Sequence, residues 1–167
     1  MEDRLPQVLF VSLLGGAAAF VLATSGALPE RVATHFGAAG QPNAYMTQAG
    51  YRLYMLVMTL GFPALMVVAI SWLPRRFPHL TNIPRRDYWM APERREQALA
   101  LLARRALWLG CALVLFACAV HWLLLRAHAA TPPRLPTVPF LVLLAVFLAF
   151  VGAWALALYR AFKGHAS

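Results

Sequence analysis

The sequence predicts an all-α integral membrane protein, a four-helix bundle with both termini in the cytoplasm. Three observations lead to this prediction. Of the 167 residues, 61% are hydrophobic, whereas soluble domains are usually less than half apolar. Four apolar runs reach membrane length, which is about 20 residues for a hydrocarbon core of about 30 Å. Eight of the 15 Lys and Arg residues lie in one segment, 74–105, between the second and third runs.

The four predicted spans cover about residues 6–28, 51–73, 106–125 and 138–159, and together they form a single membrane domain over residues 1–167. Helices are favoured over barrel strands because the runs are continuous rather than alternating. Aromatic residues near the span ends, Tyr51 and Trp122 among them, fit the membrane interfaces. Pro63 follows Gly61 within the second span and predicts a kink there.

The distribution of positive charge predicts the orientation. The N-terminus, the 74–105 segment and the C-terminus together hold 11 Lys and Arg residues, and the segments 29–50 and 126–137 with their flanks hold four. Cytoplasmic loops carry the excess of positive charge in membrane proteins. We therefore expect a multi-pass protein of the bacterial inner membrane, with both termini and the Arg-rich segment in the cytoplasm. This charge favours anionic lipid headgroups as partners, and nucleic acid is not expected.

The second half of the Arg-rich segment predicts an extension of the third helix. Pro92 suits a first helical turn, and Glu93 and Glu96 suit its positive end. No further proline occurs before Arg126. One helix of about 50 Å, at 1.5 Å per residue, is therefore expected to run from the cytoplasm through the third span.

Small residues form stripes on two of the predicted spans. The first span has Gly15 and Ala19, and the fourth has Ala145, Ala149 and Ala153, in each case four residues apart. Such stripes let helix backbones approach closely. They could pack spans one and four against each other, which we favour, or present a face to another subunit.

Two histidines are candidates for chemistry outside the Arg-rich segment. His35 lies in the outer loop with Phe36 and Asn43, and these three are candidate binding residues. The loop's glycines and Asn43 indicate tight turns, and the role we favour for His35 is to hold those turns. His121 lies inside the third span, where an ionisable group is a functional candidate by default. We place it near the interface, beside Trp122.

The Arg-rich segment has its own candidate surface for lipid headgroups or a protein partner. Its residues are Arg85, Arg86, Asp87, Tyr88, Trp89, Arg94 and Arg95. Arginines attract anionic headgroups, and Arg, Tyr and Trp are also the usual anchors of protein interfaces. The sequence does not separate these two uses.

Enzymatic activity, a metal site and a cofactor are not expected. The chain has no phosphate-binding glycine loop, no dinucleotide turn, no HExxH and no CxxC motif. Cys111 and Cys118 are interpreted as apolar packing residues. The interiors of the spans hold no Asp, Glu, Lys or Arg, which is unfavourable for an ion-coupled transporter.

The outer loop resembles a bacterial membrane family known as domain of unknown function 1648. The resemblance rests on residues 28–43, LPERVATHFGAAGQPN, and its matching positions are Leu28, Pro29, His35, Phe36, Gly40 and Pro42. The stretch from Asn82 to Arg95 is similar to a loop found in many members. The resemblance implies a membrane location and no transferable catalytic residues. The same domain begins the SdpI-like proteins, which confer immunity to a secreted bacterial toxin.

These observations predict a non-enzymatic membrane protein that acts as an interaction or accessory subunit of a larger membrane protein complex. The first alternative is an SdpI-like immunity or sensor protein whose outer loop, with His35, meets a secreted peptide. A small transporter is the third possibility.

Overall fold

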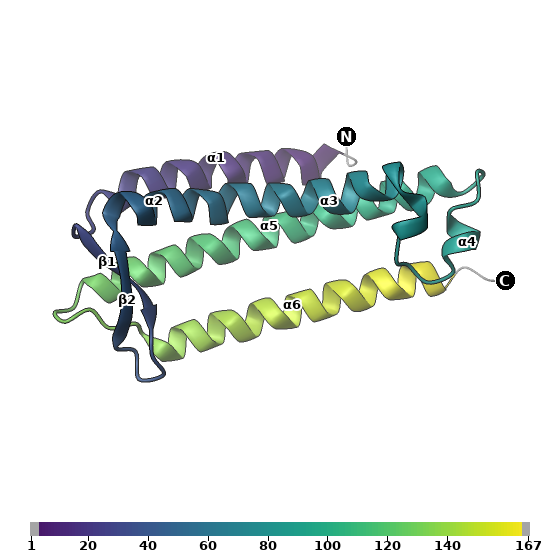
Figure 1. The fold of residues 1–167 in the computed structure, drawn as a ribbon. Helices are drawn as coiled ribbons and strands as arrows, with labels where there is room; N and C mark the ends of the chain where they lie inside the picture. The colour runs from purple at the N-terminus through teal and green to yellow at the C-terminus, as the bar shows by residue number, and fades with distance from the viewer. Residues whose placement is uncertain (1–3, 165–167) are drawn as a thin grey trace.

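A computed structural model describes residues 4–164 and consists mainly of four long helical segments lying side by side (Figure 1). The first is α1 (Leu5–Ser25), and the second combines α2 (Gln48–Leu56), the π-helical turn η2 (Val57–Gly61) and α3 (Phe62–Arg76). The third is α5 (Arg95–His128), and the fourth is α6 (Thr137–Lys163). All four are long and apolar enough to cross a membrane, which confirms the four predicted apolar segments.

Both ends of the described chain lie at the same end of the bundle as the Arg-rich segment (Figure 1). The predicted cytoplasmic termini themselves, residues 1–3 and 165–167, lie outside the described residues. The opposite end carries a β-hairpin and the connection between α5 and α6 (Figure 1).

The β-hairpin corrects the all-α prediction. Strands β1 (Arg31–Phe36) and β2 (Pro42–Thr47) pair antiparallel in the outer loop. The turn between them is closed by backbone bonds, from Gly37 N–H to Gln41 O at 2.8 Å and from Gly40 N–H to Gly37 O at 2.8 Å. Short strands that mix polar and apolar residues give little periodicity, so only the turn residues were visible in the sequence.

Gly40 is a position that only glycine suits. Its φ is 79°, in the left-handed region. A Cβ there would also lie 2.6 Å from Leu135 O, and the Leu135 N–H donates to Gly40 O at 3.0 Å. The hairpin turn is thereby fixed against the segment that leads into α6.

Helix α5 is the centre of the bundle, because it packs against α1, α3 and α6. A core cluster of Phe10, Ala17, Cys111 and Val114 joins α1 to α5. At Gly110, side chains of α1 and α3 lie close to the backbone of α5. A Cβ at this position would lie 2.5 Å from Val67 and 2.7 Å from Phe10. The glycine therefore allows α1 and α3 to meet α5 at one level.

Pro63 produces a π-helical turn rather than a break in the second helix. The N–H of Phe62 bonds to the carbonyl of Val57, five residues earlier. Thr59 donates its hydroxyl to Met55 O at 2.7 Å inside the same stretch. A single π-helical turn is a frequent device for absorbing irregularity within a helix, and the chain continues as α3 without leaving the bundle.

The predicted extension of the third helix is confirmed. Helix α5 runs for 34 residues, or about 50 Å at 1.5 Å per residue, although it begins at Arg95 rather than Pro92. Residues 91–94 form a turn in which Ala91 O accepts from the N–H groups of both Arg94 and Arg95. Arg95 then donates from Nη2 to Arg75 O at 2.7 Å, which joins the extension to the end of α3.

The expected packing of spans one and four is wrong. Helix α6 packs along α5, which lies between α6 and α1 (Figure 1). The small residues of both stripes, Gly15, Ala19, Ala145, Ala149 and Ala153, are exposed on the outside of the bundle. The stripes were visible in the sequence, but the neighbour of each helix depends on the three-dimensional arrangement around α5.

We expect Gly110→Ala to destabilise the protein by about 1–3 kcal/mol, because the added methyl group overpacks the crossing with Phe10 and Val67. Thermal unfolding in detergent measures the change. Gly152→Ala is the matched control, since a Cβ at Gly152 in α6 meets nothing within 4 Å. Equal unfolding temperatures for the two variants would contradict the close crossing.

Candidate functional site

A buried histidine connects three helices near the hairpin end of the bundle. His121 in α5 is 0% exposed. Its Nδ1 lies 2.6 Å from the hydroxyl of Tyr51 in α2, and its Nε2 lies 2.8 Å from the hydroxyl of Thr24 in α1. The ring also meets Phe20 edge-on, with a centroid distance of 5.1 Å. We call His121, Tyr51 and Thr24 the histidine network.

The contacts of the network determine which atoms donate. Thr24 gives its hydroxyl proton to Phe20 O at 2.7 Å, so its oxygen accepts from His121 Nε2–H. Tyr51 then donates to Nδ1, the acceptor nitrogen of a neutral imidazole. Every polar atom of the three side chains that needs a partner has one. The network is therefore suited to fixing the relative positions of α1, α2 and α5.

The side chain of His121 faces the interior of the bundle, whereas its neighbour Trp122 faces outward. Trp122, the next residue, is 51% exposed, while His121 points into the bundle. Successive residues of a helix are turned by about 100°, so neighbours in sequence face different surroundings. Tyr51, interpreted from the sequence as an interfacial aromatic, is likewise only 1% exposed. Nothing in the sequence indicated that Thr24 is a hydrogen-bond partner of His121.

Further hydrogen bonds attach the outer loop to the helix ends around the network. His128 accepts from Ala33 N–H at Nε2 (3.0 Å) and donates from Nδ1 to Leu124 O (2.9 Å), which holds β1 against α5. Arg52 donates to Ser25 Oγ at 2.9 Å. Sequence reasoning missed His128. Its spacing of seven residues from His121, two helical turns, places it on the same side of α5.

The outer-loop candidates His35, Phe36 and Asn43 lie on the hairpin, in different surroundings. His35 and Asn43 are exposed, and Phe36 packs against the apolar cluster around Tyr51. His35 and Phe36 border a cavity of about 280 Å³ above α5 and α6. Within the described chain the His35 side chain makes no hydrogen bond, so the predicted role of holding the turns is wrong. Backbone bonds hold the turn instead.

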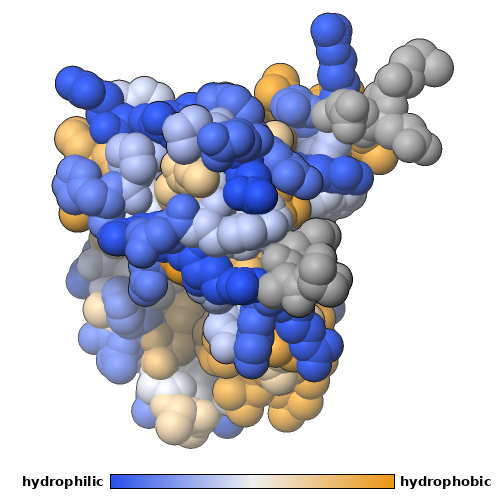
Figure 2. Space-filling view, turned by 90° about the vertical axis from the view of Figure 1, so that its right-hand side faces the viewer, coloured by the Kyte–Doolittle hydropathy of each residue, from blue (hydrophilic) through white to orange (hydrophobic). Residues whose placement is uncertain are grey.

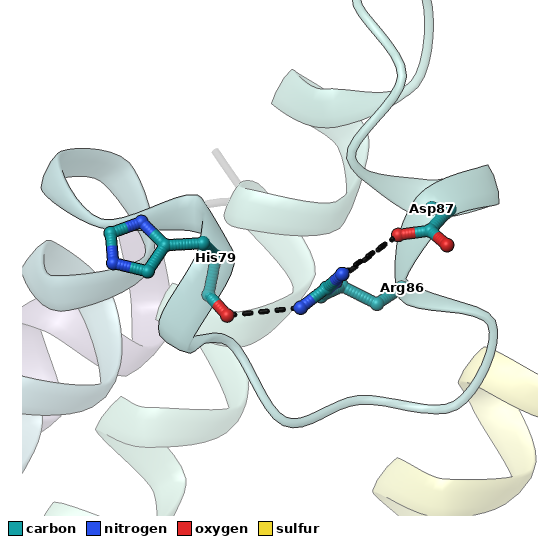
Figure 3. Close-up of polar contacts among 3 residues, drawn as sticks. All are labelled: His79, Arg86 and Asp87. Carbon is teal, nitrogen blue, oxygen red and sulfur yellow. Dashed lines mark hydrogen bonds and ion pairs between the residues drawn. The ribbon is translucent and has the colours of Figure 1, made fainter.

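The Arg-rich connector, residues 77–94, links α3 to α5 and contains the short helices η3 (Pro78–Leu80) and α4 (Arg86–Trp89). The end of the bundle that it covers is predominantly hydrophilic (Figure 2). Arg86 joins its two halves, because its Nη1 donates to His79 O at 3.0 Å and its Nη2 pairs with Asp87 at 3.1 Å (Figure 3).

The predicted docking residues of the connector divide into an exposed group and a buried one. Tyr88 is partly exposed, with the guanidinium carbons of Arg85 and Arg94 at 5.3 and 4.2 Å from its ring centroid. Arg85, Arg86 and Asp87 are exposed as well. Arg94 and Arg95 are half-buried, and Arg95 is engaged with Arg75 O.

Trp89 was predicted as a docking residue, but the structure buries it. Its side chain is 4% exposed, and its indole N–H donates to Phe162 O at 2.8 Å. The Trp89 and Phe162 rings also meet edge-to-face, with centroids 5.4 Å apart. Trp89 therefore attaches the connector to the last turn of α6, and its ring is not available to a partner.

The chemistry of these groups is structural in character. Among residues 4–164, no group of three or more His, Cys, Asp or Glu side chains could hold a metal ion. Both ring nitrogens of His121 and of His128 are engaged within the protein. The exposed surfaces include the hairpin, the Arg–Tyr surface of the connector and the outer face of α6.

Comparison with known proteins gives a family match for the first part of the chain. Residues 12–67 match the family described as domain of unknown function 1648 (DUF1648), in agreement with the resemblance of the outer loop. The matched range covers most of α1, the hairpin, α2 and part of α3, and it ends before the Arg-rich connector. No curated protein and no solved structure matches the chain.

The histidine network predicts a stability effect for Tyr51→Phe. The change removes the donor to His121 Nδ1 and leaves a buried acceptor without a partner, which typically costs about 1–3 kcal/mol. Thermal unfolding in detergent measures the loss. Tyr54→Phe is the matched control because Tyr54 is exposed in the same helix. A Tyr51→Phe protein as stable as the control would contradict the hydrogen bond.

The Trp89 contact predicts a local effect for Trp89→Ala. Loss of the indole frees the connector from Phe162, and a locally opened segment is cleaved more readily by proteases. We expect faster trypsin cleavage at Arg85, Arg86 and Arg94 in detergent, read by mass spectrometry. Leu80→Ala serves as the control, because Leu80 is exposed in η3 of the same connector. Faster cleavage in the control alone would contradict the assignment.

Proposed function

We propose that this multi-pass membrane protein is an interaction subunit, bound through α6 to a transmembrane helix of another membrane protein. The observation that carries the proposal is the exposure of α6. None of the residues in its most apolar 18-residue window is buried. Its small residues, on which close helix packing depends, face outward.

The two sides of α6 are chemically distinct. On the inner side, Phe147 stacks on Phe116 of α5 with centroids 4.3 Å apart, and Trp154 donates to Arg105 O at 2.9 Å. At about 100° per residue, Ala145 and Ala149 fall on the opposite side, where both are exposed. Gly152 lies there too, with nothing within 4 Å of a Cβ placed on it. A partner backbone could therefore approach α6 closely.

The proposed orientation places the Arg-rich connector and both termini in the cytoplasm of a bacterial inner membrane. The support is the excess of Arg at the connector end together with the location of both described chain ends there (Figure 1). In this orientation the exposed side chains of Arg85, Arg86 and Tyr88 face the cytoplasm beside the proposed partner.

We further propose that the protein has no enzymatic activity of its own. Its buried polar groups near the hairpin, those of the histidine network, are saturated by bonds to one another. A catalytic group has to reach a reacting atom, and these side chains are turned into the bundle. Their arrangement favours a scaffold for interaction over a reaction site.

The double substitution Ala145→Leu with Ala149→Leu tests the proposal. Extraction of the tagged full chain from its native membrane in mild detergent, followed by mass spectrometry, should recover one protein in stoichiometric amount. The added isobutyl groups hold a partner backbone away from α6, so we expect recovery of that protein to fall at least tenfold.

Ala155→Leu is the matched control, because it adds the same group at an exposed position on the flank of α6. It should leave recovery unchanged. Loss of the partner in both variants, or in neither, would count against the assigned face. A protein that is purified with no partner, or only with copies of itself, would contradict an accessory role.

A further inference from the structure

A cavity of about 290 Å³ lies between α3, α5, α6 and the Arg-rich connector. Its walls within the bundle are apolar and include Ala69, Leu73, Leu102, Trp154 and Leu158. Such a volume is at the lower end for ligand cavities. It suits part of a flexible apolar chain better than a whole drug-sized molecule.

The cavity is elongated along the helices. From Phe77 at the connector end to Ala69, both of which line it, the chain rises by about 12 Å at 1.5 Å per residue. This is less than half of a hydrocarbon core of about 30 Å. Its length therefore suits one membrane leaflet, and its direction along the helices is that of a lipid acyl chain.

The connector forms the polar end of this cavity. Thr81, Asn82 and Ile83 lie across it, and the bond from Arg86 to His79 O holds this segment in place (Figure 3). Thr81 is 8% exposed, and its buried hydroxyl has no hydrogen-bond partner among residues 4–164. Buried hydroxyl groups in proteins normally have a partner, and an ester oxygen of a lipid is an acceptor of the right kind.

The charge around the entrance selects the headgroup. Phe77 borders the cavity, and the guanidinium carbon of Arg76 lies 5.7 Å from its ring centroid. Residues 74–105 hold eight arginines against Asp87, Glu93 and Glu96. The exposed surface at this end is predominantly hydrophilic (Figure 2). Because arginines outnumber the acids there, a negatively charged headgroup would meet an excess of positive charge.

We propose that this cavity binds one anionic phospholipid, with an acyl chain between α3 and α6 and the phosphate near Arg76. The lipid would fill the space that α3 and α6 leave because each packs on α5 rather than on the other. The cavity does not include the outer face of α6, so lipid binding can be tested separately from binding of the proposed protein partner.

Comparison of two lipids tests the proposal on the purified full chain. Native mass spectrometry in mild detergent would follow binding of phosphatidylglycerol and phosphatidylcholine with identical acyl chains. We expect one tightly held phosphatidylglycerol per chain, bound about fivefold more strongly than phosphatidylcholine, as expected for one basic residue near an anionic headgroup. Arg76→Gln should reduce this preference at least twofold without affecting the fold, because Arg76 is exposed.

Substitutions inside the cavity test its location. Ala69→Phe should fill the space and lower retention of both lipids at least tenfold, and Thr81→Val should weaken both by a smaller factor. Ala119→Phe is the matched control, since Ala119 lines an apolar groove between α5 and α6. If Ala69→Phe does not fold, Leu158→Phe on the opposite wall replaces it.

Two results would overturn the proposal. Equal retention of the two lipids by the unsubstituted protein would contradict the proposed preference for an anionic headgroup. Retention by the cavity variants equal to that of Ala119→Phe would place the lipid elsewhere on the surface. Neither result bears on recovery of a protein partner through α6.

Discussion

The bundle depends on one requirement, that polar groups buried in a membrane protein find their partners inside it. His121 meets this requirement by accepting from Tyr51 and donating to Thr24. The two bonds reach different helices, so they fix the arrangement of α1, α2 and α5 around His121. Removing one partner leaves the others buried and unpaired, whereas an apolar pair of the same shape would simply pack.

The fourth helix is held in a different way. Helix α6 is joined to the rest by Phe147 on Phe116 and by the Trp154 bond to Arg105. At the connector end, Trp89 adds a hydrogen bond to Phe162. The outward-facing residues of α6 are exposed along most of the helix. This leaves both the outer small-residue face and the cavity beside α3, and the two proposals use these two regions separately.

The sequence predicted those parts of the structure that depend on local patterns of apolar residues and proline. Four apolar runs indicated the four helices, and the absence of proline after Pro92 indicated the length of α5. The hairpin was missed because residues 31–36 mix polar and apolar side chains without a clear period. The partners of His121 and Trp89 could not be predicted, since Tyr51 is 70 residues from His121 and Phe162 is 73 residues from Trp89. Such long-range contacts depend on which helices become neighbours.

The range that matches the family, residues 12–67, contains Thr24 and Tyr51 but not His121. Its hairpin likewise donates from Ala33 to His128, which lies outside that range. The range that matches the family is therefore smaller than the structural unit in which these hydrogen bonds have both partners. If residues 12–67 were excised, the hydroxyl of Tyr51 and the backbone of β1 would lose the groups that satisfy them. In this chain, the second half completes the module that the first half begins.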